Sequence, residues 1–142
     1  MVKVANAAQV QLAVNFARNS GVRLVVRNTG HDFMGRSAGA EALGVWMGGL
    51  KGLEHFREAG TVRIGAGVQV KELYTFAERE GVTAVGGECR GIGVAGGYVL
   101  GGGNGPMVST VGLGSDQIVE AEMVLADGRV VVVNKKENTD LF

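Results

Sequence analysis

Two segments of the chain have the apolar spacing of amphipathic helices. In the first, apolar residues recur at intervals of three and four, at Val10, Ala13, Val14 and Ala17. Asn6 and Gln9 have the capping-box spacing at its start, and Gly21 stands where a helix-ending glycine belongs. The second predicted helix covers residues 70–80 and is stopped by Gly81.

Short apolar runs rich in β-branched residues alternate with these helices. They predict strands over residues 22–27, 43–47 and 61–66. Two further runs, 118–126 and 129–133, flank Asp127-Gly128, a pair that favours a type I′ hairpin turn. Strand and helix in alternation, followed by a hairpin, predict an α+β domain with a mixed sheet.

Composition changes this picture mainly through glycine. The chain has 25 glycines among 142 residues, far above the usual share of about 7%. With one proline and 46% hydrophobic residues, it is neither collagen-like nor a disordered linker. Twelve of the glycines lie between Gly86 and Gly114, with patterned segments on both sides. We interpret this stretch as a functional loop system inside one domain.

Charge and cysteine content exclude several classes of function. With 14 basic and 14 acidic residues the net charge is zero, which argues against nucleic acid as a partner. No apolar run approaches the ~20 residues of a bilayer span, so we expect no membrane partner. A single cysteine, Cys89, excludes a disulfide framework and a cysteine-based zinc site, and no metal-ligand spacing is present. His55 lies in a charged connecting segment and is expected at the surface.

A polar loop follows the predicted strand at residues 22–27. It reads Arg27-Asn-Thr-Gly-His-Asp-Phe-Met-Gly-Arg-Ser37. Gly30 and Gly35 would let the backbone approach an anion, and the hydroxyls of Thr29 and Ser37 would add donors, so the loop is suited to a pyrophosphate. The alternative is an ordinary polar surface turn in which His31 is simply solvated.

A second motif imitates a dinucleotide-binding fingerprint. Gly91-Ile-Gly-Val-Ala-Gly96 matches G-x-G-x-x-G, and Asp116 follows about 20 residues later. The motif should follow a strand directly and open a helix, but residues 87–90 separate it from the nearest apolar run. The segment Gly101-Gly-Gly-Asn-Gly-Pro106 also forbids a helix of ordinary length. A noncovalent NAD-binding domain is therefore disfavoured.

Taken together, the loops resemble the FAD-linked oxidases of the vanillyl-alcohol-oxidase superfamily, above all the fungal berberine-bridge-enzyme-like group. After the loop at 27–37, the matching segments are Gly86–Tyr98, Gly101–Gly105, Gly112–Ile118, Leu125–Gly128 and Glu137–Phe142. The resemblance covers nearly the whole chain. It implies the PCMH-type FAD-binding fold, with an N-terminal α/β subdomain (about 1–54) and an antiparallel-sheet subdomain (about 55–142) that grip FAD between them.

The resemblance also implies which residues contact the cofactor. Those matching the loop that cradles the FAD pyrophosphate are Asn28, Thr29, Gly30, His31, Asp32, Gly35 and Ser37. Those matching the wall along the flavin ring and ribityl chain, where a Cβ would collide, are Gly86, Gly87, Gly91, Gly93, Gly96 and Gly97. Ile92 is expected at the flavin edge where oxygen arrives. At the adenine end, Ile118 matches a backbone contact and Asp116 is expected to brace the turn.

Two residues match positions of covalent attachment. His31 matches the histidine that bonds to the flavin 8α-methyl carbon, and Cys89 matches the cysteine that adds a thioether to flavin C6 in the bicovalent branch. Relatives typically carry Pro and Thr after that cysteine, where this chain has Arg90 and Gly91. Single and double attachment therefore both stay open, and for Cys89 so does a small buried thiol that packs inertly.

By this resemblance we expect the FAD-binding portion of a flavin-dependent oxidoreductase, which transfers a hydride from an alcohol or amine C–H to flavin and is reoxidised by oxygen. A substrate domain beyond residue 142 would bind the small-molecule substrate, and no catalytic residue is expected within the chain. The alternative is a truncated, catalytically inactive nucleotide-binding or interaction module. Proteins of this group are often secreted, but the localisation of this chain stays open. The sequence also leaves open the oligomeric state, the substrate, and whether the enzyme is an oxidase or a dehydrogenase.

Overall fold

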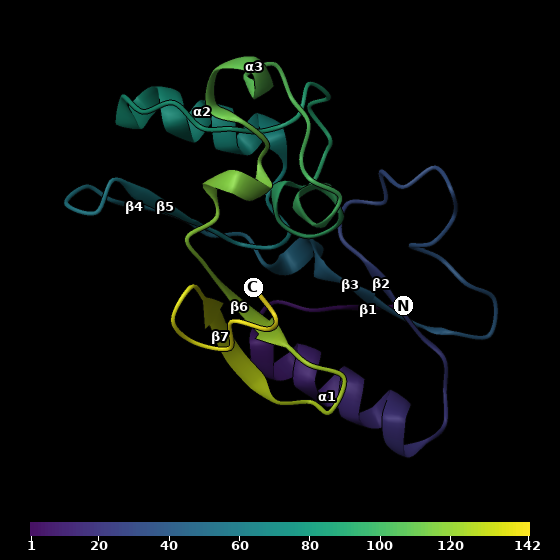
Figure 1. The fold of residues 1–142 in the computed structure, drawn as a ribbon. Coiled ribbons are helices and arrows are strands. Elements are labelled where there is room, and N and C mark those ends of the chain that lie inside the picture. The colour runs from purple at the N-terminus through teal and green to yellow at the C-terminus, as the bar shows by residue number, and fades with distance from the viewer.

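Three small sheets carry the fold (Figure 1). The computed structural model describes all residues, 1–142. A parallel sheet has the spatial order β1 (Val2–Lys3), β3 (Leu43–Trp46), β2 (Leu24–Arg27). Two antiparallel pairs are formed by β4 (Leu53–Phe56) with β5 (Thr61–Ile64), and by β6 (Glu120–Val124) with β7 (Val130–Asn134). The predicted strands are all present, and each is one or two residues shorter than predicted at one end or both.

Helix α1 (Ala7–Asn19) packs against the parallel sheet. The buried residues of this first core cluster are Val4, Val10, Ala13 and Val45. The Oδ1 of Asn6 accepts from the N–H of Gln9 at 2.9 Å, as the capping-box spacing predicts. The side chain of Gln9 reaches back one residue further than that motif requires, to the N–H of Ala5 at 2.8 Å.

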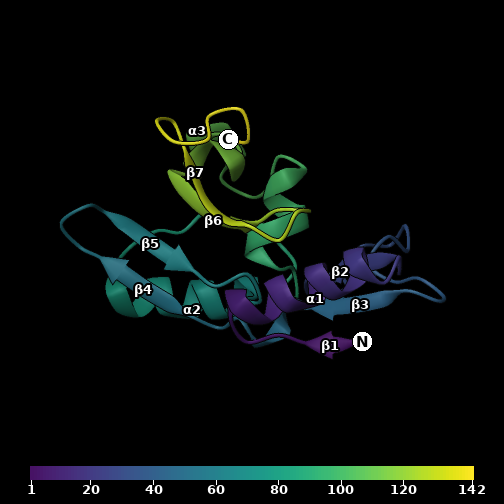
Figure 2. The ribbon, with the colours of Figure 1, turned by 90° about the horizontal axis from the view of Figure 1, so that it is seen from below.

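Helix α2 (Val70–Glu80) confirms the second predicted helix and ends at Gly81. It lies beside the β4–β5 pair, as Figure 2 shows. Val70 and Leu73 on its inner face join Val68 and Val94 in a second core cluster of buried residues. A full capping box closes the start: the Glu72 carboxylate accepts from the N–H of Gln69 at 2.7 Å, and the Gln69 side chain caps the first turn in return.

The glycine-rich stretch contains only short helical turns. They are η2 (Val94–Tyr98), whose backbone is non-helical at Ala95 and Gly96, α3 (Val108–Val111) and η3 (Ser115–Gln117). The turn η1 (Met47–Gly49) lies earlier, after β3. No long helix follows Gly96, which agrees with the prediction from residues 101–106. None of the helices has the length and apolarity of a membrane span.

The hairpin turn between β6 and β7 differs from the predicted one. A type I′ turn needs positive φ at both central residues, but only Gly128 (φ 86°) has it, and Asp127 does not. The N–H of Gly128 donates to the C=O of Leu125, and the N–H of Leu125 donates to the C=O of Arg129, both at 2.9 Å. The prediction of type I′ is wrong because Gly128 serves as a bulge residue after a one-residue-longer turn.

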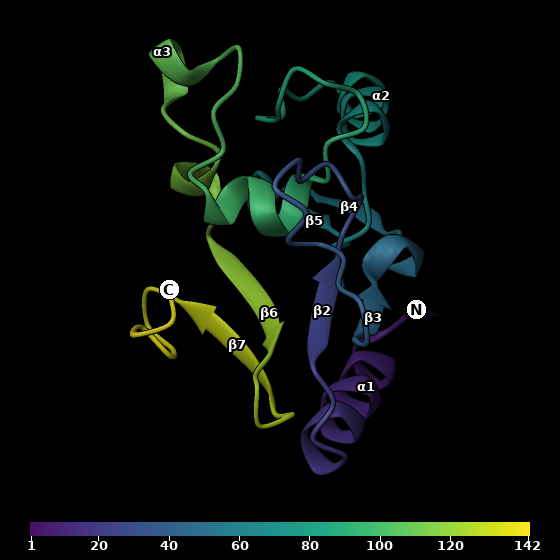
Figure 3. The ribbon, with the colours of Figure 1, turned by 90° about the vertical axis from the view of Figure 1, so that its right-hand side faces the viewer.

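This last hairpin packs against the first helix. The Nε2 of Gln11 donates to the C=O of Gly128 at 2.7 Å, and the guanidinium of Arg18 donates to the C=O of Asp127. Val124 packs against the first core cluster. In Figure 3 the hairpin lies on the same side of the molecule as α1, with which β6 is in contact. The second half of the chain therefore contributes to the core of the first, and the proposed subdomain boundary near residue 54 stays a prediction.

His55 does not lie in a surface connector, so that expectation is wrong. It belongs to β4, pairs with Val62, and keeps only 9% of its side chain exposed. Its Nδ1 lies 3.2 Å from the Glu80 carboxylate at the end of α2. The charged neighbours hide the period-two alternation of this strand, in which every second residue is partly covered.

Candidate functional site

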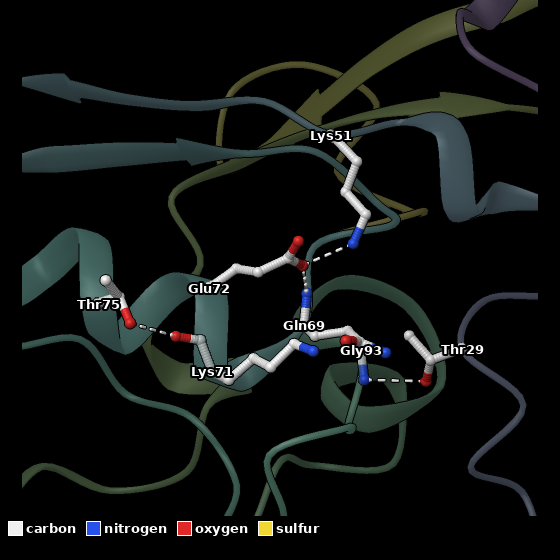
Figure 4. A network of polar contacts seen from close by, with 7 residues as sticks. All are labelled: Thr29, Lys51, Gln69, Lys71, Glu72, Thr75 and Gly93. Atoms are coloured by element: carbon white, nitrogen blue, oxygen red, sulfur yellow. Dashed lines mark hydrogen bonds and ion pairs between the residues drawn. The ribbon is translucent and has the colours of Figure 1, made fainter.

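The predicted site begins at the carboxyl end of β2, where parallel strands usually present ligand-binding loops. The loop that follows β2 is bonded to the glycine-rich stretch. The N–H of Gly93 donates to the hydroxyl of Thr29 at 3.1 Å, a contact between residues 64 positions apart, and Figure 4 shows it. The Nδ2 of Asn28 donates to the C=O of Ala95. The fold therefore brings together the two segments that the sequence singled out.

Much of the loop backbone is unpaired. The N–H groups of residues 29–33 and that of Ser37 have no hydrogen-bond acceptor within the chain. Gly30 and Gly35 both have positive φ, at 79° and 77°. Consecutive free N–H groups beside residues of left-handed conformation form the kind of nest that binds anions.

An ion pair closes the same loop. The Asp32 carboxylate accepts from Arg36 three times: from its backbone N–H and its Nη2, both at 2.6 Å, and from its Nε at 3.0 Å. These hydrogen bonds from Arg36 hold the pKa of Asp32 below its ordinary value. From the sequence we predicted Asp32 as a cofactor contact and did not predict its ion pair with Arg36. The signal for that pair was present, because the two residues carry opposite charges and lie four positions apart.

The two predicted attachment residues are both exposed. His31 makes no hydrogen bond or ion pair within the chain, and neither does the thiol of Cys89. Exposure of Cys89 contradicts the alternative of a buried inert thiol. The reason lies in its neighbours: Gly86 and Gly87 are buried and Ile92 packs against the second core cluster, so residues 88–90 between them face outward.

The segment around Cys89 is fastened to the start of α2. The N–H of Val70 donates to the C=O of Ile92 at 2.9 Å, and that of Lys71 donates to the C=O of Arg90 at 3.1 Å. The first-turn N–H groups of a helix have no partners within the helix, so these carbonyls satisfy them. The Arg90 side chain lines a groove along α2 together with Lys71.

The glycines of this stretch make room largely for the chain's own side chains. A Cβ at Gly87 would lie 2.6 Å from Ile92 Cδ1, and one at Gly93 or Gly96 would lie 2.8 Å from Asn28 Nδ2. Gly91 and Gly97 face open space instead. The close approach that the sequence analysis assigned to a flavin is therefore, at three positions, an approach of protein to protein. The contact of these residues with a cofactor stays a prediction.

Two tyrosines that bond to the glycine-rich stretch were not identified from the sequence. The Tyr74 hydroxyl donates to the C=O of Gly87 at 3.0 Å, and the Tyr98 hydroxyl donates to the C=O of Gly103 at 2.9 Å. Burial raises the pKa of both phenols, so both remain protonated donors. No spacing signal in the sequence marks either one, because each bond joins it to a backbone carbonyl of a glycine.

The far end of the site is a braced turn. The Asp116 carboxylate accepts from the N–H of Leu113 at 2.7 Å, as expected for a residue that braces this turn. The N–H of Gly114 donates to the C=O of Gly103 at 2.8 Å, which ties the turn to the preceding glycines. Ile118 follows, half-buried. No group of three or more His, Cys, Asp or Glu side chains in the structure is placed to hold a metal ion.

Comparison with known proteins gives a consistent result. Residues 1–134 match the family model described as an FAD binding domain. Over 141 residues the chain is 45% identical to the FAD-linked oxidoreductase ZEB1 of Gibberella zeae, a match that covers 95% of this chain and 25% of ZEB1. The chain spans about a quarter of the length of the curated relatives it matches first.

Solved structures agree with the sequence matches. The VAO-type flavoprotein MtVAO615 of Myceliophthora thermophila C1 superposes with a TM-score of 0.90 at 40% identity, over 97% of this chain and 26% of that one. A BBE-like protein of Physcomitrella patens has a TM-score of 0.91 at 38% identity, over 99% of this chain and 31% of its own.

Proposed function

The chain belongs to the FAD binding domain family, and from this premise we propose that it is the FAD-holding part of an oxidoreductase that oxidises an alcohol or amine C–H of a small-molecule substrate, with oxygen as acceptor. The family match and the structural matches confirm FAD as the cofactor and the α+β, PCMH-type fold expected from the resemblance. They do not favour the alternative of an inactive nucleotide-binding or interaction module.

The residues present fit the cofactor. A diphosphate needs several hydrogen-bond donors in a concave arrangement, and the unpaired N–H groups of residues 29–33 supply them. This run of free donors, held against the glycine-rich stretch by the bond from Gly93 to Thr29, is the observation that carries the proposal. His31 lies within this run and Cys89 lies in the glycine-rich stretch, and both side chains are exposed and unbonded.

When bound, FAD supplies the redox chemistry, because it accepts the hydride from the substrate and returns the electrons to oxygen. The residues of this chain bind and orient it. The free N–H groups would hold the diphosphate, while the bonds from α2 to Arg90 and Ile92 would hold the Cys89 segment at the flavin. The two predicted contacts at the adenine end, Asp116 and Ile118, complete the proposed set.

We place the covalent link at His31. Its imidazole nitrogen would form a bond to the 8α-methyl carbon as the N–H proton and one methyl proton are released. Forming this link would be a two-electron oxidation, for which dioxygen, the acceptor already proposed, would be the oxidant. Cys89 is the second candidate position, for a thioether to flavin C6. There the thiol proton and the ring hydrogen at C6 would be released, again with dioxygen as the two-electron oxidant.

Flavin retention after denaturation tests the proposal. We expect purified protein loaded with FAD to be yellow, and the colour to stay with the protein after denaturation and filtration, as read from its absorption spectrum. His31→Ala should release the flavin into the filtrate, whereas Cys89→Ser should retain it through His31. Protein that stays colourless after incubation with FAD would contradict the proposed function. If the His31→Ala variant retains all of its flavin after denaturation, the covalent link is at Cys89 instead.

A further inference from the structure

Arg27, the last residue of β2, holds an unpartnered charge at the base of the proposed diphosphate loop. It pairs with Trp46 of β3 in the parallel sheet and is half-buried. Alternate residues of a strand share a face, and Val25, two positions earlier, is buried while Val26 is 53% exposed. The Arg27 side chain therefore leaves the strand on its covered face.

Its guanidinium lies directly against Gly30. A Cβ at Gly30 would be 2.7 Å from both Nε and Nη2 of Arg27 and 2.9 Å from its Cζ. Gly30 sits within the run of unpaired N–H groups at residues 29–33, so the guanidinium and the free donors occupy the same small region. Glycine is required at this position twice, by the positive φ of 79° and by the guanidinium beneath it.

No acceptor in the chain neutralises this cation. Arg27 takes part in no ion pair and no side-chain hydrogen bond, and the acidic residue of the same loop, Asp32, is already paired with Arg36. The nitrogen atoms of Arg27 are not among the buried unpaired polar atoms of the chain, so the guanidinium remains accessible and free to bind an incoming anion. Its planar fork of donors suits two phosphate oxygens, which carry charge and accept several hydrogen bonds at once.

We propose that Arg27 supplies the positive charge for the FAD diphosphate, while the N–H groups of residues 29–33 supply the remaining donors. The role rests on the proposed function. It makes Arg27 a binding residue beyond the set that the resemblance implies, and it explains why a chain of zero net charge, with no lysine in this loop, can hold a dianionic linkage. Arg36 is not equivalent, because Asp32 neutralises it.

The test compares flavins with and without phosphate. Binding is measured in the His31→Ala background, so that a covalent link does not mask affinity, with FAD and riboflavin as probes and flavin fluorescence as readout. We expect Arg27→Gln to weaken FAD binding on the order of 10- to 100-fold, as for loss of charged hydrogen bonds, and to leave riboflavin binding unchanged. Arg27→Lys, which keeps the charge but lacks the planar fork of donors, should recover part of the FAD affinity. Arg23→Gln, at an exposed arginine of the same segment, should change the binding of neither flavin.

Three outcomes would overturn the assignment. Unchanged FAD affinity in Arg27→Gln would show that the charge is not used. An equal loss for FAD and riboflavin, not restored by Arg27→Lys, would show that Arg27 acts only by packing beneath Gly30. Failure of the unsubstituted protein to take up FAD at all would contradict the proposed function itself, and the role of Arg27 with it.

Discussion

Asn28 illustrates how one side chain holds the two halves of the site together. Its Nδ2 donates to the C=O of Ala95, and its Oδ1 is buried without a partner in the chain. Its amide fits only because residues 93 and 96 are glycines. The sequence marked Asn28 as a cofactor contact, while the structure shows it as the link between the loop and the glycine-rich stretch.

Substitution of Gly93 tests this link. The φ of Gly93 is −77°, which alanine adopts freely, so Gly93→Ala acts only through its Cβ, 2.8 Å from Asn28 Nδ2. We expect it to lower the free energy of unfolding by about 1–3 kcal/mol, as overpacking does. Chemical denaturation measures the loss. Gly91→Ala, whose Cβ would meet nothing within 4 Å, is the matched control.

A double substitution identifies the cause. If the amide of Asn28 is what the new Cβ displaces, Asn28→Ala combined with Gly93→Ala will cost less than the sum of the two single changes. Additive losses, or a Gly93→Ala variant as stable as Gly91→Ala, would refute the steric account.

At the scale of elements, the first turn of α2 organises the site. Its free N–H groups are satisfied by carbonyls of residues 90 and 92, so the segment that carries Cys89 forms part of the helix cap. Glu72 completes the cap by accepting from the N–H of Gln69 at 2.7 Å and from Nζ of Lys51 at 2.6 Å. Figure 4 shows these bonds beside the contact of Thr29 with Gly93. Loss of the cap would therefore loosen the site as well as the helix.

The pH dependence of stability follows from Glu72. Burial raises the pKa of its carboxyl, but hydrogen bonds from Lys51 and from the Gln69 N–H outweigh this and lower it from the ordinary value of 4.5. A lowered folded-state pKa gives stability that is complete above the unfolded-state value and is lost as pH falls through the folded-state one. We expect Glu72→Gln to cost about 0.5–1 kcal/mol at neutral pH, measured by denaturant unfolding.

That difference between wild type and Glu72→Gln should shrink as the pH falls from 4.5 through the lower folded-state pKa of Glu72, because below that pKa the carboxyl is protonated in both states. Glu78→Gln, on the exposed side of the same helix and without a partner, is the control and should be neutral. A constant difference across this pH range would mean that the ionised form of Glu72 contributes nothing.

At the scale of the whole molecule, contacts between α1 and the β6–β7 hairpin join the beginning of the chain to its end. The bond from Gln11 to the C=O of Gly128 spans 117 positions. Val124 adds apolar contact with the first core cluster. The parallel sheet that carries the loop at residues 28–37 is thus supported, through α1, by residues far along the sequence.

Gln11→Ala should loosen this support. We expect a loss of about 0.5–1.5 kcal/mol in unfolding free energy, as for one net hydrogen bond, with faster amide hydrogen exchange in β6, β7 and α1 together. Gln117→Ala removes a local bond of the same chemistry, from Nε2 to the C=O of Val111, and should affect only its own turn. Exchange that changes in the hairpin alone would show that the hairpin does not support α1.

The spacing of apolar residues and the glycines that end helices and turns were enough to predict most of the helices and strands. The apolar spacing that leads to Gly21 and Gly81 produced α1 and α2, and Asn6 caps its helix as expected. The errors have local causes. Charged neighbours hide the strand at His55, and the Asp127-Gly128 pair is compatible with more than one turn, a choice made when the hairpin docks on α1.

The sequence alone was sufficient for the order of the elements, the two glycine-bearing loops and, through their motifs, the family and its cofactor. Those features depend on backbone preferences and apolar periods that act within a few residues. Only the tertiary structure decided that Asn28 lies between Gly93 and Gly96, that Arg27 lies unpaired beneath Gly30, and that Cys89 faces outward. Contacts such as that of Gly93 with Thr29 join residues 64 positions apart, and no local spacing encodes them, because they form only when the packed core brings the loops together.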